Sequence, residues 1–185
     1  MGIASILLKG RMEICQVRRR IEINCNIPEY LQYDDLTPSD WGLIYEKYVG
    51  QIFEDEGYQV MYNGLSEGYF DKGIDLIASN EQETIFIQCK YLNKIITKSK
   101  IDWILYKASA KLLKSSQANT AKKRLVFMLI TKTKEGNFSK RMPKGMQFGY
   151  TDHRNIVYPM LQYFLDHNHT QDKVKLAYRE IPMEY

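Results

Sequence analysis

Two apolar segments separated by a short polar turn limit most strongly how this chain can fold. Ile74 to Ser79 and Thr84 to Tyr91 are rich in β-branched and apolar residues, and the four residues between them, Asn80 to Glu83, have the composition of a turn. The pattern predicts a β-hairpin in which Ser79 pairs with Thr84. Because side chains alternate between the two faces of a strand, this pairing fixes the face on which every other residue of the hairpin lies.

The predicted register places several polar side chains at one end of the hairpin. Counting back from the turn sets Asp75 opposite Gln88, and directly opposed residues have Cβ atoms about 4.5–5.5 Å apart, so both side chains could contact one cation. Lys90 shares a face with Gln88, whereas the side chain of Cys89 points the other way and leaves its backbone carbonyl available as an oxygen ligand. A surface hairpin whose lysine extends to solvent is the alternative. The hairpin alone leaves both interpretations open.

The composition is that of a domain with a real core. The chain has 185 residues and 44% hydrophobic content, which fits a single domain. Cys15, Cys25 and Cys89 are odd in number and lack CxxC spacing, which argues against a disulfide framework or a zinc knuckle. We therefore expect a reducing, cytoplasmic location. The apolar run from Ile3 to Leu8 is too short for a signal peptide or a membrane span, so we expect no membrane association.

Charge is distributed unevenly along the chain. The segment from Lys90 to Tyr150 holds 15 Lys and Arg residues against two acids, Asp102 and Glu135, although the whole chain has a net charge of only +4. A basic segment after an acidic site suits a polyanionic substrate, because cations near phosphates release counterions. A solvated helix face is the alternative. The lysines that we expect to contact DNA are Lys94, Lys98, Lys100, Lys107, Lys111, Lys132 and Lys134.

A long amphipathic helix precedes the hairpin. The segment Leu36 to Asp40 has the composition of a helix start, with Ser39 or Asp40 as the N-cap, and the helix should run from about Trp41 to Glu56. Its apolar positions form one stripe at helical spacing: Trp41, Ile44, Tyr45, Tyr48, Val49, Ile52 and Phe53. Glu46 falls at the rim of this stripe, from where its carboxylate can reach a neighbouring sheet. A rim glutamate paired with lysine or water is the alternative.

The remaining segments alternate between strand and helix patterns. We expect a strand at Tyr58–Tyr62 after a helix end at Gly57, a polar loop at Asn63–Gly73, a helix at Ser99–Ser115, a doubly buried strand at Arg124–Thr131, a basic loop at Lys132–Gly149, a helix near Ile156–Leu165 and a strand at Val174–Ile181. Residues 36–131 then form a core. Residues 1–35 are an N-terminal extension that could hold short strands, and residues 132–185 complete the same domain.

Three motifs in this order resemble a known family of nucleases. Tyr45-Glu-Lys-Tyr-Val49 lies on the long helix, and Gly73-Ile-Asp-Leu-Ile77 and Ile87-Gln-Cys-Lys90 lie on the hairpin. With Gly57-Tyr-Gln-Val60 they resemble the PD-(D/E)xK superfamily, and within it the Mrr-like restriction endonucleases, in which Gln replaces the acid before xK. The resemblance covers about half of the chain. It implies an α/β fold with a restriction-endonuclease-like αβββαβ core, in which helices flank a central mixed sheet.

The resemblance also implies a chemistry and a site. Asp75 would bind Mg²⁺, with Mn²⁺ as a substitute, and Glu46 would complete the anionic ligands. Gln88 would contribute its amide oxygen or orient a water molecule, and the Cys89 carbonyl would be a further ligand. Lys90 would position the attacking water and stabilise charge on the phosphate, while keeping its own proton.

The resemblance leaves the biological role open. The first hypothesis is a Mg²⁺-dependent restriction-type DNA endonuclease, including one that depends on DNA modification, which acts on double-stranded DNA as a homodimer. The alternatives are a repair or recombination nuclease with the same core and a catalytically inactive DNA-binding module. The tail Asp166-His-Asn-His169 is more typical of a polar loop than of a zinc or HNH site. The sequence has no GxxxxGK[ST] or GxGxxG motif, so we expect no nucleotide cofactor.

Overall fold

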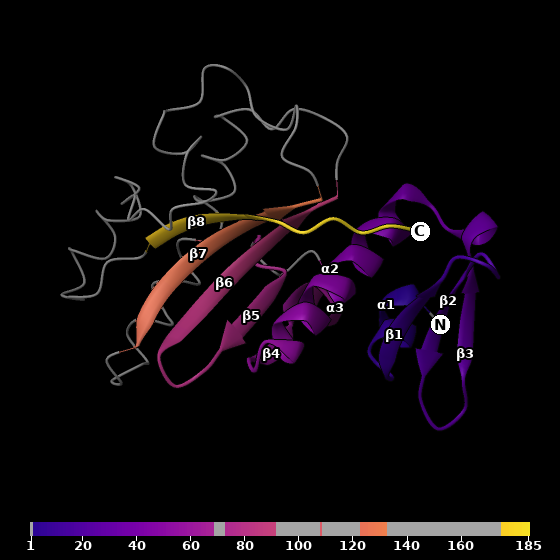
Figure 1. The fold of residues 1–185 in the computed structure, drawn as a ribbon, viewed down its shortest axis with the longest axis horizontal. Helices are drawn as coiled ribbons and strands as arrows, with labels where there is room; N and C mark the ends of the chain where they lie inside the picture. The colour runs from indigo at the N-terminus through magenta and orange to yellow at the C-terminus, as the bar shows by residue number, and fades with distance from the viewer. Residues whose placement is uncertain (1, 69–72, 92–107, 109–122, 133–174) are drawn as a thin grey trace, which may run out of the picture.

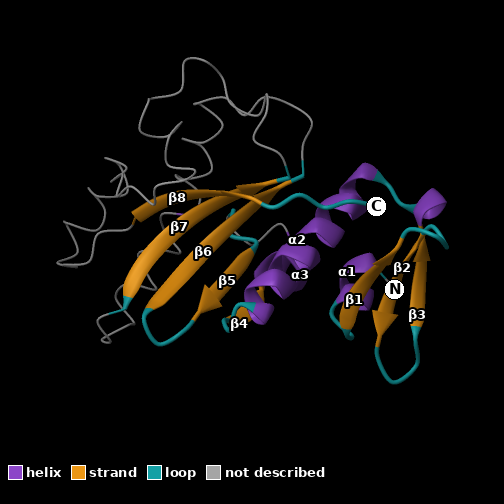
Figure 2. Cartoon of the chain, in the orientation of Figure 1, coloured by secondary structure: helices purple, strands orange, loops and turns teal. Residues whose placement is uncertain are grey.

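The computed structural model describes residues 2–68, 73–91, 108, 123–132 and 175–185 (Figure 1). The described elements are α1 (Ile3–Leu7), β1 (Arg11–Cys15), β2 (Arg20–Asn24), β3 (Glu29–Gln32), a 3₁₀ turn (Tyr33–Asp35), α2 (Pro38–Asp55), β4 (Gln59–Tyr62), α3 (Asn63–Glu67), β5 (Leu76–Ser79), β6 (Glu83–Lys90), β7 (Arg124–Thr131) and β8 (Lys175–Glu180). Helix α2 lies between two sheets, one formed by β4 to β8 and the other by β1 to β3 (Figure 2).

The larger sheet has five strands in the order β4-β5-β6-β7-β8. Strands β4, β5 and β6 are antiparallel neighbours, whereas β6, β7 and β8 run parallel to one another. The fold is therefore α/β with a mixed central sheet and helices beside it, as the sequence predicted. The apolar run of β7 is buried on both faces from Leu125 to Thr131, which confirms the expectation for that strand.

Helix α2 begins earlier than the sequence suggested. Thr37, and not Ser39 or Asp40, is the N-cap, and its hydroxyl accepts a hydrogen bond from the backbone N–H of Asp40 at 3.2 Å. The Asp40 carboxylate in turn accepts from the Thr37 backbone N–H at 2.9 Å, which completes a capping box. Pro38 occupies the first turn, where a missing N–H costs nothing. After the helix, Gly57 adopts a positive φ of 89°, as expected for a glycine that ends a helix.

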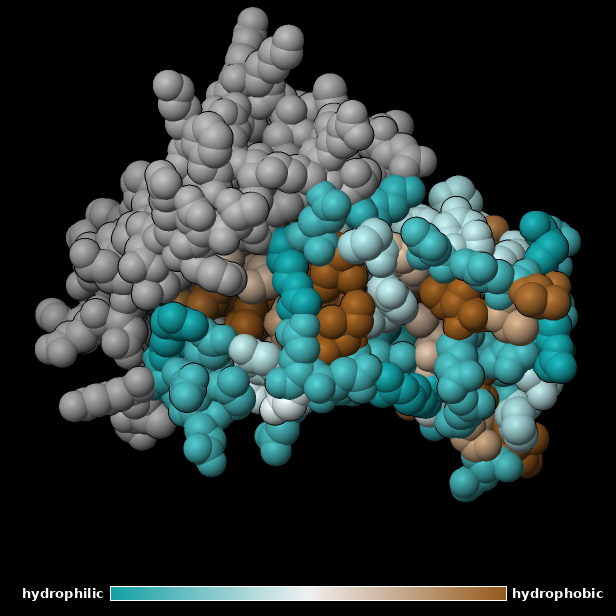
Figure 3. Space-filling model, in the orientation of Figure 1, coloured by the Kyte–Doolittle hydropathy of each residue, from teal (hydrophilic) through white to brown (hydrophobic). Residues whose placement is uncertain are grey.

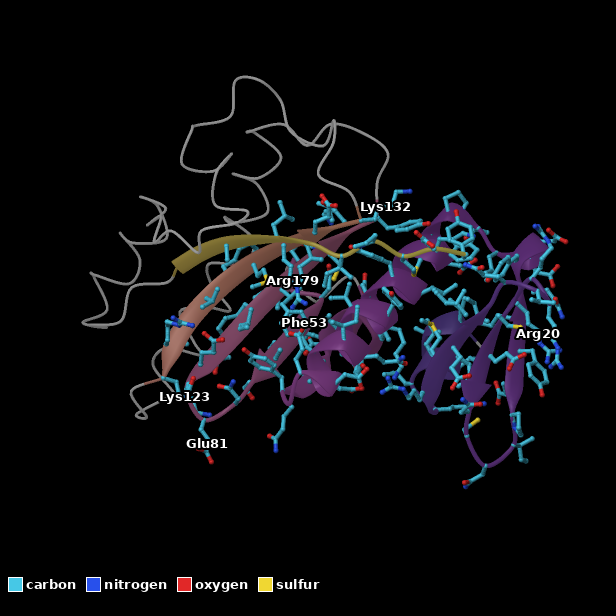
Figure 4. The ribbon with its side chains drawn as sticks, in the orientation of Figure 1. Arg20, Phe53, Glu81, Lys123, Lys132 and Arg179 are labelled. Carbon is cyan, nitrogen blue, oxygen red and sulfur yellow. The ribbon has the colours of Figure 1, made fainter. Side chains whose placement is uncertain are left out.

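One face of α2 packs on the five-stranded sheet. Tyr45, Val49 and Phe53 are buried there, and Ile44, which is also buried, completes the predicted stripe. Strand β8 is tied to the same helix, because Arg179 donates to the carboxylate of Glu56 at 2.8 Å. The Arg179 guanidinium also lies 5.2 Å from the centre of the Phe53 ring. Figure 4 labels both side chains.

The opposite face of α2 is covered by the N-terminal residues, which the sequence left largely unassigned. The antiparallel sheet β1-β2-β3 buries Met12, Ile21 and Ile23 toward the helix. The Gln51 side chain binds the edge of β1, accepting from the Met12 N–H at 2.6 Å and donating to the Met12 carbonyl at 2.8 Å. Lys47 and Gln51 are consequently buried, although both lie outside the predicted apolar stripe.

The segment after β8 returns to α2 and ends beside its first turn. The Tyr185 ring stacks on Trp41 with centroids 4.0 Å apart, and Tyr33 meets Trp41 edge-on at 5.2 Å. Hydrophilic residues cover most of the described surface in the view of Figure 3, with apolar patches between them. None of the helices in the described residues is both long and apolar enough to span a membrane.

The remaining expectations have different outcomes. The segment from Asn63, expected to be a polar loop, begins with the short helix α3, whose Ser66 hydroxyl donates to the Tyr62 carbonyl at 2.8 Å. The helices expected at 99–115 and 156–165 and the basic loop at 132–149 lie outside the described residues, apart from Ala108 and Lys132. The last strand, expected at 174–181, is β8.

Candidate active site

The hairpin of β5 and β6 has the predicted register. Ser79 pairs with Thr84 and Leu76 pairs with Ile87, which places Asp75 beside Gln88. The Asp75 backbone N–H donates to the Ile87 carbonyl at 2.8 Å, so the pairing continues to the start of β5. The sequence therefore located the hairpin and its register correctly.

The Asp75 carboxylate is buried and is held by groups of β6. It is 3% exposed, and its Oδ2 atom accepts from the backbone N–H of Cys89 at 2.6 Å and from the side-chain amide of Gln88. Gln88 is itself buried, and its amide nitrogen lies 3.3 Å from the Cys89 carbonyl oxygen. A buried carboxylate is costly unless it accepts hydrogen bonds, so these contacts stabilise the ionised form of Asp75.

The Gln88 amide presents its NH₂ group to Asp75. Its amide oxygen is the atom that a Mg²⁺ ion would need. The side chain must therefore turn its amide over before the oxygen can join the Asp75 carboxylate around a cation. The turned amide would exchange its hydrogen bond to Asp75 for a contact between its oxygen and the cation.

Glu46 reaches the hairpin from helix α2 and is half-buried, as its predicted rim position requires. Its carboxylate lies over Gly64 in α3, where a Cβ atom would overlap with Glu46 Oε2 and would lie 3.4 Å from the Asp75 α-carbon. Helix α3 is also hydrogen-bonded to the backbone of Asp75, because the Gly64 N–H donates to the Asp75 carbonyl at 2.7 Å. The absence of a side chain at Gly64 thus allows the Glu46 carboxylate to approach the backbone of Asp75.

The Cys89 thiol lies in the apolar core, on the opposite face of β6 from Gln88 as predicted. Burial raises the pKa of this thiol well above its ordinary value, and the nearby carboxylates of Asp75 and Glu46 raise the pKa further. Lys90, which is partly exposed at the end of β6, acts in the opposite direction on the same pKa. Glu46, Asp75 and Lys90 each lie close enough to this thiol to act on it electrostatically. The thiol is protonated and unreactive.

The site lies at the carboxyl ends of the parallel strands. Lys90 pairs with Thr131 at the end of β7, and Thr131 pairs with Glu180 at the end of β8. Lys132 follows directly, with its ammonium nitrogen 4.4 Å from the centre of the Tyr91 ring. Figure 4 shows Lys132 at this end of the sheet, with Glu81 and Lys123 at the other end. Ligand sites of open α/β sheets are commonly found at the carboxyl ends of strands.

Comparison with known families agrees with this geometry. Residues 42–121 match the family Mrr_cat, which is described as restriction endonuclease. These residues are therefore similar to the Mrr-like restriction endonucleases. The match spans less than half of the chain and includes Glu46, Asp75, Gln88 and Lys90. Comparison of the chain with curated proteins and with solved structures gave no match.

The donor atoms of the Mrr-like domain suit a hard divalent cation. They comprise the carboxylates of Glu46 and Asp75, the Gln88 amide oxygen once it is turned over, and the Cys89 carbonyl, and oxygen ligands of this kind are those that Mg²⁺ prefers. In the described part of the chain, no group of three or more His, Cys, Asp or Glu side chains is arranged to hold a metal. The candidate site differs from such a group because its two carboxylates are supplemented by an amide and a backbone carbonyl.

The sequence reasoning missed some residues that shape the site. Asn63-Gly64 was interpreted as part of a loop, so the contact between Gly64 and Glu46 was not foreseen. An Asn-Gly pair between a strand and an acidic motif was the available signal, although it is common in turns. Of the seven lysines expected to contact DNA, Lys132 lies at the site, and the other six (Lys94, Lys98, Lys100, Lys107, Lys111 and Lys134) lie outside the described residues.

Proposed function

We propose that the Mrr-like domain is a Mg²⁺-dependent DNA endonuclease, with Mn²⁺ able to replace Mg²⁺. The observation that carries the proposal is the approach of the Glu46 carboxylate from α2 to the backbone of Asp75, whose own carboxylate is held by Gln88, two residues before Lys90 on the hairpin. The family match supports nuclease chemistry, and the two carboxylates support a requirement for a divalent cation.

The ion would be held by Asp75 and Glu46, with Gln88 and the Cys89 carbonyl as neutral donors. A bound divalent ion would supply positive charge that stabilises the developing negative charge on the scissile phosphate. Because Gln88 adds no charge, Asp75 and Glu46 together must balance the ion. Loss of either carboxylate should therefore weaken ion binding more than loss of the amide.

Lys90 would act on the phosphate and the attacking water. Its ammonium group is a hydrogen-bond donor at the end of β6, on the same side of the strand as Gln88. In that position it would hold the water by donating a hydrogen bond and would stabilise the phosphate oxygens by its charge.

Double-stranded DNA is the proposed substrate. The 15 Lys and Arg residues between positions 90 and 150 support binding of a polyanion, because cations near phosphates release counterions. Cleavage of both strands would be explained by a homodimer that places one site on each strand. We further propose a role in restriction, including restriction that depends on DNA modification.

Nicking of a supercoiled plasmid tests the proposal. The purified chain should cleave with Mg²⁺ or Mn²⁺ and should be inactive with EDTA. Asp75→Asn, which keeps the size of the side chain, and Lys90→Ala should each lower the rate by about 10²-fold or more. Glu81→Ala, in the turn at the opposite end of the sheet, is the matched control and should leave the rate unchanged.

Two outcomes decide between the candidate functions. A protein that binds plasmid but never nicks it with any divalent metal would be a DNA-binding module, and the proposal would be wrong. Comparison of methylated with unmethylated plasmid tests the dependence on modification, because a modification-dependent enzyme should cleave the methylated form faster.

A further inference from the structure

Tyr45 occupies a central position between the elements that carry the candidate site. It is the residue directly before Glu46 on α2 and is fully buried, with 0% of its surface exposed. Its hydroxyl donates to the backbone carbonyl of Ile181 at 2.8 Å. Its ring also lies 5.2 Å from the ring of Tyr91, the residue directly after Lys90. Tyr45 therefore contacts the segments that follow both β6 and β8.

The hydrogen bond of Tyr45 continues into the end of the sheet. Ile181 donates its backbone N–H to the carbonyl of Thr131 at 2.9 Å. Thr131 is the last residue of β7 and pairs with Lys90 in the parallel register of β6 and β7. The Tyr45 hydroxyl thus connects the turn of α2 that carries Glu46 to the strand ends that carry Lys90. Ile181 and Thr131 are both buried, so water cannot readily replace this bond.

A directional bond is needed at this point because the other hydrogen bonds between α2 and the sheet, from Arg179 to Glu56 and from Tyr62 to Glu54, lie at the far end of the helix. Apolar contacts such as those of Val49 and Phe53 hold the helix on the sheet, but the hydrophobic effect has no preferred direction and tolerates small shifts along the helix axis. A functional site must keep its groups within about 0.5 Å of their working positions. A buried hydrogen bond has a defined length and angle, and it can supply this precision.

We propose that Tyr45 is a positioning residue for the metal site, which holds the Glu46 carboxylate in register with Asp75 and Lys90. The proposal rests on the nuclease function proposed above. Tyr45 contacts neither the ion nor the phosphate, because its hydroxyl is directed at the Ile181 carbonyl. It acts through the helix turn that it shares with Glu46.

Tyr45→Phe tests the proposal because it removes the hydroxyl and keeps the ring against Tyr91. The dissociation constant for Mn²⁺, measured by titration calorimetry on the full chain without DNA, should rise about tenfold, in the range found when groups that orient metal ligands are lost. The nicking rate at low Mn²⁺ should fall by a similar factor, with the KM for plasmid unchanged. Saturating Mn²⁺ should restore most of the rate, which a general loss of folded protein would not allow.

Two control variants separate positioning from stability. Tyr58→Phe removes a comparable hydroxyl bond, which Tyr58 donates to Glu83 at 2.7 Å near the opposite end of the sheet, and Mn²⁺ binding should not change. Ile23→Val weakens the buried face of the N-terminal sheet, far from the Tyr45 hydroxyl bond, and lowers the urea midpoint. Suppose that Ile23→Val and Tyr45→Phe lower the urea midpoint by the same amount. If Ile23→Val then reduces Mn²⁺ affinity as much as Tyr45→Phe does, the positioning role is wrong.

The possible failures can be distinguished. If the wild-type chain binds Mn²⁺ and nicks plasmid but Tyr45→Phe retains the same Mn²⁺ affinity, the role of Tyr45 is wrong and the nuclease function stands. A wild-type chain that neither binds Mn²⁺ nor nicks plasmid overturns the proposed function, and the role of Tyr45 in it.

Discussion

Substitution of Gly64 by alanine should separate the stability of this domain from its activity. The new methyl group would overlap with Glu46 Oε2 and lie 3.2 Å from Glu46 Cδ, whereas its distance to the Asp75 α-carbon would be an ordinary 3.4 Å. The overlap therefore involves mainly the end of a flexible side chain that can rotate away. Gly64 is helical and does not have a positive φ, so alanine fits its backbone conformation.

The expected effect on folding is small and can even be favourable. Alanine is preferred over glycine inside helices by up to about 1 kcal/mol, and a smaller part of this gain applies in a helix as short as α3. Rotation of the half-buried Glu46 side chain, whose Oε2 atom is buried, offsets part of this gain. We therefore expect the free energy of unfolding in urea to change by between zero and about +1 kcal/mol.

The expected effect on cleavage is large. Rotation of Glu46 would move its carboxylate by about 1 Å or more, and a misplacement of that size can lower a rate by about 10²-fold. Mn²⁺ affinity should fall as well. Gly42→Ala in α2 is the matched control, because a methyl group at that position contacts nothing within 4 Å, and it should leave both activity and Mn²⁺ affinity unchanged.

A double substitution tests the cause directly. In a Glu46→Ala background, Gly64→Ala should produce no further loss of Mn²⁺ affinity, because the displaced carboxylate is already absent. The reasoning is refuted if Gly64→Ala unfolds the domain by several kcal/mol, or if it keeps full nicking activity and full Mn²⁺ affinity.

Three further predictions follow from buried polar groups. Gln51→Ala should destabilise the chain by about 2–4 kcal/mol in urea unfolding, because it leaves the N–H and carbonyl of Met12 unpaired; an unchanged midpoint would contradict this. Burial lowers the pKa of Lys47 below its ordinary value of 10.5, so the protonated form destabilises the fold. Stability should therefore rise as the pH increases from the lowered pKa toward 10.5, and a stability advantage of Lys47→Met at neutral pH should shrink over that interval. Gln88→Ala should weaken Mn²⁺ binding by about tenfold in calorimetry, less than Asp75→Asn does, and an equal or larger loss would contradict the charge argument.

The elements of the candidate site could be predicted from sequence because they depend on local patterns. The alternation in the hairpin and its polar turn were sufficient to pair Ser79 with Thr84. Helical spacing placed Glu46 at the rim of the buried face of α2, and the structure confirms that position. The helix boundary was less accurate, because Thr37, Ser39 and Asp40 are all suitable caps and the geometry of the capping box decides among them.

The contacts between distant segments could not be predicted in the same way. The sequence of α2 indicates one apolar stripe, yet Lys47 and Gln51 are buried because the N-terminal sheet covers the other face. No periodicity in residues 1–35 shows which surface they will cover. The return of the C-terminal segment to the first turn of α2, where Tyr185 stacks on Trp41, likewise depends on how the strands are ordered in the sheet.

The sequence by itself determined on which elements the candidate side chains lie, because propensity and periodicity act over a few residues. Only the tertiary structure decided how these elements meet. The contact of Glu46 with Gly64 and the bond from Tyr45 to Ile181 join residues far apart in the chain. Such contacts form where folded surfaces fit together, and their geometry is a property of the packed fold that no short stretch of sequence contains.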